Sequence, residues 1–233
     1  MNVVHDLAQR LEDNREFITN WMAEKRSQVP IPIYGSVDIR DCGWKIAVVD
    51  ANHFPAGFNN VSTEDEGRLS GLLYDHIIRQ HPSCKWVHLY PESHTRNPGY
   101  VENVATIKRL LIKAGFRCTV GSPEMEGHGS VDGITGPLIL DQVTVIDDSL
   151  VIAGESPDLV MLNNDLTEGI VPGISAHEVS PPPHMGWQRR RKSEHYACLQ
   201  EYVNEIAEIL DIDPWHLLTL SLIHISEPTR LGM

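Results

Sequence analysis

The fold of this chain is constrained most by short apolar runs that alternate with longer helical patterns. The run Lys85–Tyr90 has the length of a strand, the stretch from Tyr100 to Ala114 has helical periodicity, and Arg117–Val120 is another short run. Gly115 follows the helical stretch, and glycine is typical of a helix C-terminus. A succession of strand, helix and strand predicts parallel pairing, because parallel strands need a long connection. The predicted fold class is therefore α/β, with a mainly parallel sheet flanked by helices.

Two further apolar runs, Ile46–Val49 and Asp158–Leu162, are predicted to be buried strands of this sheet. Short and continuous apolar runs are typical of parallel strands that are covered on both faces. The sequence also predicts a hairpin, in which Leu138–Ile146 pairs with Leu150–Ala153. The glycine-rich stretch from Pro123 to Gly136 is interpreted as a mobile loop.

Helical periodicity predicts one helix from about Val3 to Ser27, one from the stretch Ser62–Glu66 to about Gln80, and one from about Ser193 to Leu210. These elements suggest four consecutive segments. The predicted segments are an N-terminal helix at 1–28, an α/β substrate-binding domain at 29–179, a connector and helix at 180–218, and a non-native, adapter-like tail at 219–233.

Polar side chains gather where the predicted strands end. Ligands of open α/β sheets bind beyond the carboxyl ends of the strands, and an amino acid needs carboxylates for its ammonium group and a cation for its carboxylate. The alternative is that these residues make only turn and cap hydrogen bonds. The predicted substrate-binding residues are Asp38, Arg40, Asp50, Asn52, Asn59, Asn60, Glu92, His94, Arg96, Asn163, Asn164 and Asp165.

A basic run, Arg189–Lys192, precedes the last predicted helix. Cations are unfavourable at a helix N-terminus, whereas a bound anion there would be stabilised. We therefore predict an anion-binding group made of Arg190, Lys192 and Ser193. A solvated basic turn is the alternative.

Composition limits the partners and the compartment. The net charge of −13 argues against nucleic acid or an anionic membrane as the main partner. No apolar run is long enough for a membrane helix and no signal sequence is evident, which predicts a cytoplasmic protein. Its four cysteines are scattered and form no C-x-x-C pair, so reduced thiols are expected.

Histidine is abundant, with 12 residues, but no H-E-x-x-H or H-x-H pair is present. No metal-ligand set is therefore predicted, and no catalytic residue can be assigned. A metal-dependent hydrolase that uses His94, His128 and nearby acids remains the less favoured alternative. His88 lies within a predicted strand and is interpreted as a core residue.

Several long motifs occur in order and resemble the proteobacterial-type glutamate–cysteine ligase family. They are the segment from Tyr34 to Asn60, L-V-M-L-N-N-D-L-T-E-G-I-V-P from Leu159, G-W-Q-R-R-R-K-S-E-H-Y from Gly186, and I-D-P-W-H-L from Ile212. The resemblance extends to about Leu218. It implies the N-terminal portion of a ligase whose fold is similar to the ATP-grasp enzymes.

The resemblance also implies an activity, in which ATP and Mg²⁺ support the joining of glutamate to cysteine for glutathione synthesis. ATP and Mg²⁺ would be held mainly by a C-terminal half that the sequence does not show. Carried over by motif position, the expected site residues are Asp38, Arg40, Asn52, Asn59, Asn60, Asn163, Asn164 and Asp165, with Arg190, Lys192 and Ser193 as secondary members. A non-catalytic amino-acid-binding module is the main alternative, and the oligomeric state stays open.

Overall fold

The computed structural model describes residues 3–93, 97–186, 189 and 191–217, which form two compact units. One unit contains the described residues of 1–31, 36–51 and 189–233, and the other contains those of 32–35 and 52–188. The units therefore interleave along the chain, whereas the sequence suggested consecutive segments. The segment 219–233 lies outside the described residues.

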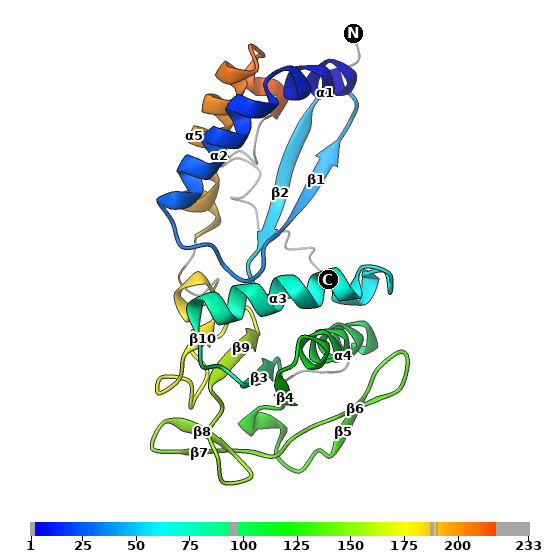
Figure 1. Cartoon of the computed structure of the whole chain (residues 1–233), viewed down its shortest axis with the longest axis vertical. Coiled ribbons are helices and arrows are strands. Elements are labelled where there is room, and N and C mark those ends of the chain that lie inside the picture. The colour runs from blue at the N-terminus through cyan, green and yellow to red at the C-terminus, as the bar shows by residue number, and fades with distance from the viewer. Residues whose placement is uncertain (1–2, 94–96, 187–188, 190, 218–233) are drawn as a thin grey trace, which may run out of the picture. The chain divides into compact units, whose positions relative to one another are not determined.

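A four-stranded parallel sheet forms the centre of the second unit, and its strand order is β10-β9-β3-β4 (Figure 1). Its strands are β3 (Trp86–Pro91), β4 (Arg117–Val120), β9 (Leu159–Asn163) and β10 (Val179–Ser180). In register, Leu89 of β3 lies between Val120 of β4 and Met161 of β9. This sheet confirms the predicted α/β class and the predicted strands at 85–90, 117–120 and 158–162.

The two faces of this sheet belong to different apolar cores. Val87 and Leu89 face a core that includes side chains of α3 (Glu66–Gln80) and α4 (Pro98–Lys113). Trp86 and Tyr90 lie on the opposite face of β3 and pack in a core shared with the hairpin of β7 (Val143–Ile146) and β8 (Ser149–Ile152). Every residue of β3 and β9 is buried, which explains why their sequences are continuous apolar runs.

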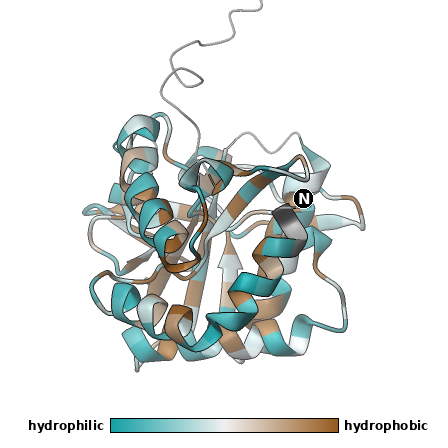
Figure 2. Ribbon diagram, turned by 90° about the horizontal axis from the view of Figure 1, so that it is seen from above, coloured by the Kyte–Doolittle hydropathy of each residue, from teal (hydrophilic) through white to brown (hydrophobic). Residues whose placement is uncertain are grey.

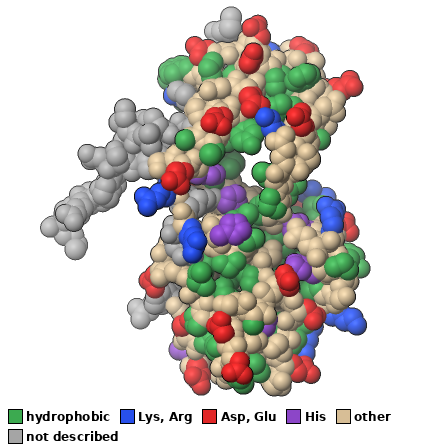
Figure 3. Space-filling view, turned by 90° about the vertical axis from the view of Figure 1, so that its left-hand side faces the viewer, with side chains coloured by type: hydrophobic (Ala, Val, Ile, Leu, Met, Phe, Trp, Pro, Cys, Tyr) green, Lys and Arg blue, Asp and Glu red, His purple; other side chains and the backbone are tan. Residues whose placement is uncertain are grey.

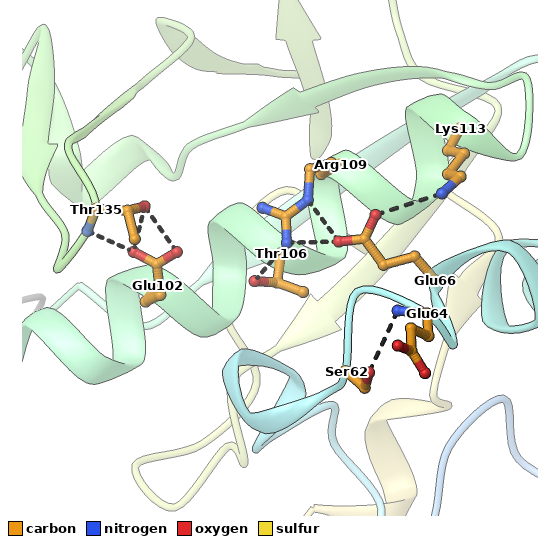
Figure 4. Close-up of polar contacts among 8 residues, drawn as sticks. All are labelled: Ser62, Glu64, Glu66, Glu102, Thr106, Arg109, Lys113 and Thr135. Carbon is orange, nitrogen blue, oxygen red and sulfur yellow. Dashed lines mark hydrogen bonds and ion pairs between the residues drawn. The ribbon is translucent and has the colours of Figure 1, made fainter.

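Helices α3 and α4 lie side by side and are joined by ionic contacts (Figures 1 and 4). The Glu66 carboxylate accepts a hydrogen bond of 3.0 Å from Arg109 and lies 3.4 Å from the Lys113 ammonium. The bond from Arg109, followed by the charge of that residue, lowers the pKa of Glu66. Nearer the N-terminus of α4, the Glu102 carboxylate accepts from the backbone N–H of Thr135 at 3.0 Å and from its hydroxyl at 2.8 Å.

Two small hairpins complete the second unit. They pair β5 (Ser130–Asp132) with β6 (Pro137–Ile139), and β7 (Val143–Ile146) with β8 (Ser149–Ile152). The hairpin across residues 147 and 148 agrees with the sequence, but its first strand is shorter than predicted. The stretch from Pro123 to Gly136, which the sequence predicts to be one loop, contains a 3₁₀ turn and β5. The prediction misses β5 because it places the partner strand, β6, in the other hairpin.

The first unit contains three α-helices, a 3₁₀ helix and a hairpin among its described residues. Ile46–Val49 is a strand, as predicted, but its predicted place in the parallel sheet is wrong. Strand β2 (Ile46–Asn52) pairs with β1 (Ser36–Asp41) rather than with the four-stranded sheet. A four-residue connection, Cys42–Lys45, is too short for a parallel crossover. Residues Ile46–Val49 are only partly buried, in contrast to the fully buried strand that the sequence predicted.

The helices of the first unit are α1 (Val3–Asp13), α2 (Arg15–Ser27) and α5 (Lys192–Ile209). The single helix predicted for 3–27 is thus interrupted at Asn14, whose side chain donates to the Arg10 carbonyl at 2.9 Å. Trp21 of α2 donates to Glu205 of α5 at 2.9 Å, and Lys25 pairs with the same carboxylate at 2.6 Å.

Short 3₁₀ helices lie at Phe58–Asn60 (η1), Pro123–Met125 (η2), Pro183–Met185 (η3) and Pro214–Leu217 (η4). Figure 2 shows that the longer helices carry hydrophilic and hydrophobic residues together, as expected for helices with one covered face. Over the described part of the chain, no helix has both the length and the apolar character that crossing a membrane requires.

Candidate functional site

A cavity of about 390 Å³ lies at the carboxyl ends of the central strands β3 and β9. Ligands of open α/β sheets bind in this position. Glu92 and Ser93 come directly after β3, and Asn164 and Asp165 come directly after β9. The lining residues are Glu92, Ser93, Glu124, Asn164, Asp165, Leu166, Thr167, Glu168, Gly169 and Val171. We call this the acidic cavity.

Adjacent parallel strands explain why distant parts of the sequence meet here. The last residues of the two strands, Pro91 and Asn163, are partners in register. The residues that follow them therefore emerge at the same edge of the sheet. The structure brings together three of the predicted substrate-binding residues: Glu92, Asn164 and Asp165.

Two side-chain turns shape the loop after β9. The Asn164 side-chain oxygen accepts from the Leu166 backbone N–H at 2.9 Å. One Asp165 carboxylate oxygen accepts from the Thr167 N–H at 3.2 Å. Such turns are the structural alternative raised by the sequence. Both roles are compatible here, because each turn uses a single oxygen while the same side chains line the cavity.

Two tyrosines fix the geometry of the acidic cavity. Partly buried Tyr100 donates its hydroxyl to the Asn163 carbonyl at 2.7 Å and accepts from the Glu92 N–H at 2.8 Å, which ties the ends of β3 and β9 together. Tyr90 donates to the Glu124 carboxylate at 3.1 Å. Burial, followed by the Glu124 charge, raises the pKa of Tyr90, so this hydroxyl stays a donor at neutral pH.

The charge of the acidic cavity has one sign. Its lining includes the carboxylates of Glu92, Glu124, Asp165 and Glu168, and none of the lining side chains within the described residues is Lys or Arg. Figure 3 shows acidic side chains spread over the face drawn there, in line with the net charge of −13. A cavity of this kind attracts a cationic group and repels polyphosphate.

ATP and Mg²⁺, the cofactors implied by the family resemblance, do not fit the acidic cavity. A triphosphate needs cations or a row of backbone donors, and this lining is anionic. Throughout the part of the chain that the structure describes, no three His, Cys, Asp or Glu side chains are grouped in a way that could hold a metal ion. His94, which the metal-hydrolase alternative requires, lies outside the described residues.

Other predicted residues of the second unit have different surroundings. Asn163 is buried, and its amide donates to the Pro55 carbonyl. The Asn52 oxygen caps a turn by accepting from the Phe54 N–H at 2.9 Å. Asn59 and Asn60 are exposed in η1, where their side chains are 3.4 Å apart. None of these four side chains lines the acidic cavity.

The remaining predicted residues belong to the first unit or are not described. Asp38 and Arg40 are exposed within β1, and Asp50 lies within β2. Lys192 pairs with Asp50 at 3.2 Å, so one predicted anion-binding residue contacts a carboxylate, and Ser193 is the second residue of α5. Arg96, His94 and Arg190 fall outside the described residues.

Sequence reasoning missed Glu124 and Glu168. Glu124 lies in η2, beyond the end of β4, which is the strand next to β3. The sequence predicts site residues where polar residues follow predicted strands, and this criterion also fits Glu124. Because the sequence instead predicts a mobile loop from Pro123, Glu124 is not among the predicted residues. Glu168 lies within the N-N-D-L-T-E-G motif, three residues after Asp165, and only the folded loop shows that it lines the cavity.

The fold and the cavity define an α/β protein with an anionic site at the edge of a parallel sheet. The family model "GshA: Glutamate-cysteine ligase" matches residues 8–225, so this chain belongs to the glutamate–cysteine ligase family. A solved structure from Methylobacillus flagellatus KT, named "Putative gamma-glutamylcysteine synthetase", is similar, with 34% identity and a TM-score of 0.81.

That comparison covers 91% of this chain and 51% of the Methylobacillus protein, so the chain spans about half the length of its relative. A search of curated proteins found no match. Membership of the family confirms the resemblance read from the motifs.

Proposed function

We propose that this chain supplies the amino-acid-binding part of a glutamate–cysteine ligase and that the acidic cavity holds the α-ammonium group of glutamate. The observation that carries this proposal is the set of four carboxylates at the carboxyl ends of the parallel strands. Membership of the ligase family supports an amino acid as the ligand. A cation in this cavity would gain charge-assisted hydrogen bonds of about 1.5–3 kcal/mol each.

Glutamate suits the cavity better than cysteine does, for a reason of protonation. In the proposed reaction the cysteine amine must lose a proton before it can form an amide bond, whereas the glutamate amine does not react. Neighbouring carboxylates stabilise an ammonium ion and raise its pKa. An amine held among Glu92, Glu124 and Asp165 would therefore be hard to deprotonate. The role of these residues is to hold the ammonium group of glutamate. Both glutamate carboxylates then point away from the anionic lining, which presents the γ-carboxylate for reaction.

We propose ATP and Mg²⁺ as the cofactors of the ligase, bound by groups other than those that line the acidic cavity. The anionic lining supports this division, because phosphate groups would be repelled by it. The cytoplasm is the proposed compartment. All four cysteines are free, as expected where thiols stay reduced.

Calorimetric titration of the purified chain tests the glutamate proposal. We expect L-glutamate to bind and glutarate, which lacks the ammonium group, to bind at least tenfold more weakly. L-cysteine and 3-mercaptopropanoate form a second pair that reports on the cysteine alternative. Equal affinities for glutamate and glutarate would overturn the assignment of the cavity.

A non-catalytic amino-acid-binding module is the second candidate, since the acidic cavity alone accounts for binding. The chain incubated with glutamate, cysteine and ATP–Mg²⁺ tests whether it catalyses the reaction by itself. Formation of γ-glutamylcysteine together with ADP and phosphate supports the ligase and contradicts a non-catalytic module. Glutamate binding without product means that this chain by itself binds the amino acid without joining it to cysteine.

A further inference from the structure

A second and larger pocket, of about 590 Å³, lies in the second unit and shares no lining residue with the acidic cavity. Most of its lining side chains are apolar, and we call it the apolar pocket. Its lining residues are Ile33, Tyr34, Gly35, Ala56, Gly57, Phe58, Val61, Leu69, Leu72, Leu73, Asp75, His76 and Arg79. The volume lies in the range of about 300–1,000 Å³ that is common for small-molecule sites.

One wall of the apolar pocket is aromatic and its position is fixed. The rings of Tyr34 and Phe58 have their centroids 5.3 Å apart, and the Tyr34 hydroxyl donates to the Ala56 carbonyl at 2.5 Å. Buried Asn103 accepts from the Phe58 N–H at 2.9 Å and donates to the Pro55 carbonyl at 3.3 Å. These bonds hold the loop in place, so the wall is formed before any ligand arrives.

The opposite wall is one side of α3. Leu69 and Leu73 pack toward the core, but Leu72 is 55% exposed and lines the pocket. An exposed leucine on its own needs no explanation. Here Leu72 adds to the apolar lining of the pocket.

Three polar side chains of α3, within about one turn, complete the lining: Asp75, His76 and Arg79. Asp75 and Arg79 have opposite charges at an i, i+4 spacing, but neither side chain has a hydrogen bond or ion pair within the described residues. The buried Nε2 atom of His76 also has no hydrogen-bond partner there. Burial, followed by the charges of Arg79 and His81, lowers the pKa of His76, so its ring is neutral at pH 7.

We propose that the apolar pocket binds an α-amino acid with a large apolar side chain, such as phenylalanine or leucine. The side chain packs between the Tyr34–Phe58 wall and Leu72. The carboxylate contacts Arg79 and His76, and the ammonium group contacts Asp75. The charges of the pocket match a zwitterion, in contrast to the acidic cavity, which matches a cation alone. The proposal is independent of the ligase function.

Titration calorimetry with L-phenylalanine, L-leucine and three comparison ligands tests the proposed chemistry. L-phenylalanine is expected to bind, whereas 3-phenylpropanoate lacks the ammonium group and phenethylamine lacks the carboxylate. We expect each analogue, and L-alanine, to bind at least tenfold more weakly than L-phenylalanine. The absence of phenylalanine and leucine binding at millimolar concentrations would overturn the proposal, as would equal binding of the analogues.

Matched variants show where the ligand binds. Leu72→Glu places a charge in the pocket at an exposed position, so the fold should tolerate it and phenylalanine binding should be lost. Ile112→Glu is the control, since Ile112 is 54% exposed on α4 and outside the pocket. Arg79→Gln should weaken binding at least fivefold and Arg68→Gln, also on α3, should not. Unchanged binding by Leu72→Glu would overturn the assignment.

Discussion

At the scale of single residues, His88 shows how a buried histidine couples folding to pH. Its side chain is fully buried in β3, as the sequence predicted. The Nε2 atom lies 3.0 Å from the Gly121 carbonyl and therefore donates, so Nδ1 accepts from the Thr119 hydroxyl at 2.9 Å. Thr119 in turn accepts from the Trp86 indole at 2.9 Å. While the Thr119 hydroxyl donates to Nδ1, His88 is held in the neutral form with its proton on Nε2.

The buried, neutral state of His88 predicts that acid destabilises the fold. Burial lowers the pKa of His88 to about 4, from its ordinary value of 6.5. Between these values the unfolded chain binds a proton that the folded chain does not, so stability falls as pH falls from 6.5 toward 4. We expect this histidine alone to cost about 2 kcal/mol between pH 7 and pH 5. Urea unfolding at the two pH values measures it.

The variant His88→Gln separates this effect from that of other histidines. Glutamine keeps one donor and one acceptor but does not titrate. The pKa values of His76 and His177 are also lowered by burial, so the variant should retain part of the pH dependence. Its loss of stability from pH 7 to pH 5 should be smaller than that of the wild type by about 2 kcal/mol. An unchanged difference would show that His88 is already protonated or exposed.

At the scale of elements, α4 begins with a strong local signal. Asn97 is its N-cap and accepts from the Gly99 N–H at 2.9 Å, and Pro98 occupies the first helical position. Both residues favour a helix start in this order. Helix α4 provides buried side chains to the core that it shares with α3, and its Tyr100 accepts from the Glu92 N–H beside the acidic cavity. A well-defined start of α4 therefore stabilises both the core and the cavity.

Replacement of the cap should lower stability without loss of the fold. We expect Asn97→Ala to decrease the free energy of unfolding by about 1 kcal/mol, because an N–H of the first turn loses its acceptor. Asn97→Ser should restore most of this loss, since serine is also a good N-cap. Thermal or urea unfolding of the three proteins measures the effect. Equal stability of the alanine variant and the wild type would argue against a cap at Asn97.

The elements that the sequence identified best are those whose local pattern and buried surroundings agree. Strands β3 and β9 are buried on both faces, and a continuous apolar run is the expected result. Ile46–Val49 has the same pattern but lies in a hairpin, because apolar character does not reveal the partner strand. The short connection Cys42–Lys45 was the available sign of a hairpin.

At the scale of the whole molecule, the candidate site was predictable only where strands are neighbours. Glu92, Asn164 and Asp165 meet because β3 and β9 are adjacent, a relation that the strand-end rule assumed correctly. The same rule also selected Asp38 and Asp50, which lie within the strands of a different compact unit. Sequence order does not show which strands share a sheet, so the rule selected more residues than the cavity contains.

The central claim is that the carboxylates of the acidic cavity bind glutamate, and Asp165→Asn tests it most directly. Asparagine keeps the oxygen that caps the turn at Thr167 and removes only the charge. Asp132→Asn, at an exposed position of β5 outside the cavity, is the matched control. Titration calorimetry of L-glutamate should give at least tenfold weaker binding for Asp165→Asn and unchanged binding for the control. Equal affinity of Asp165→Asn and the wild type would contradict the account.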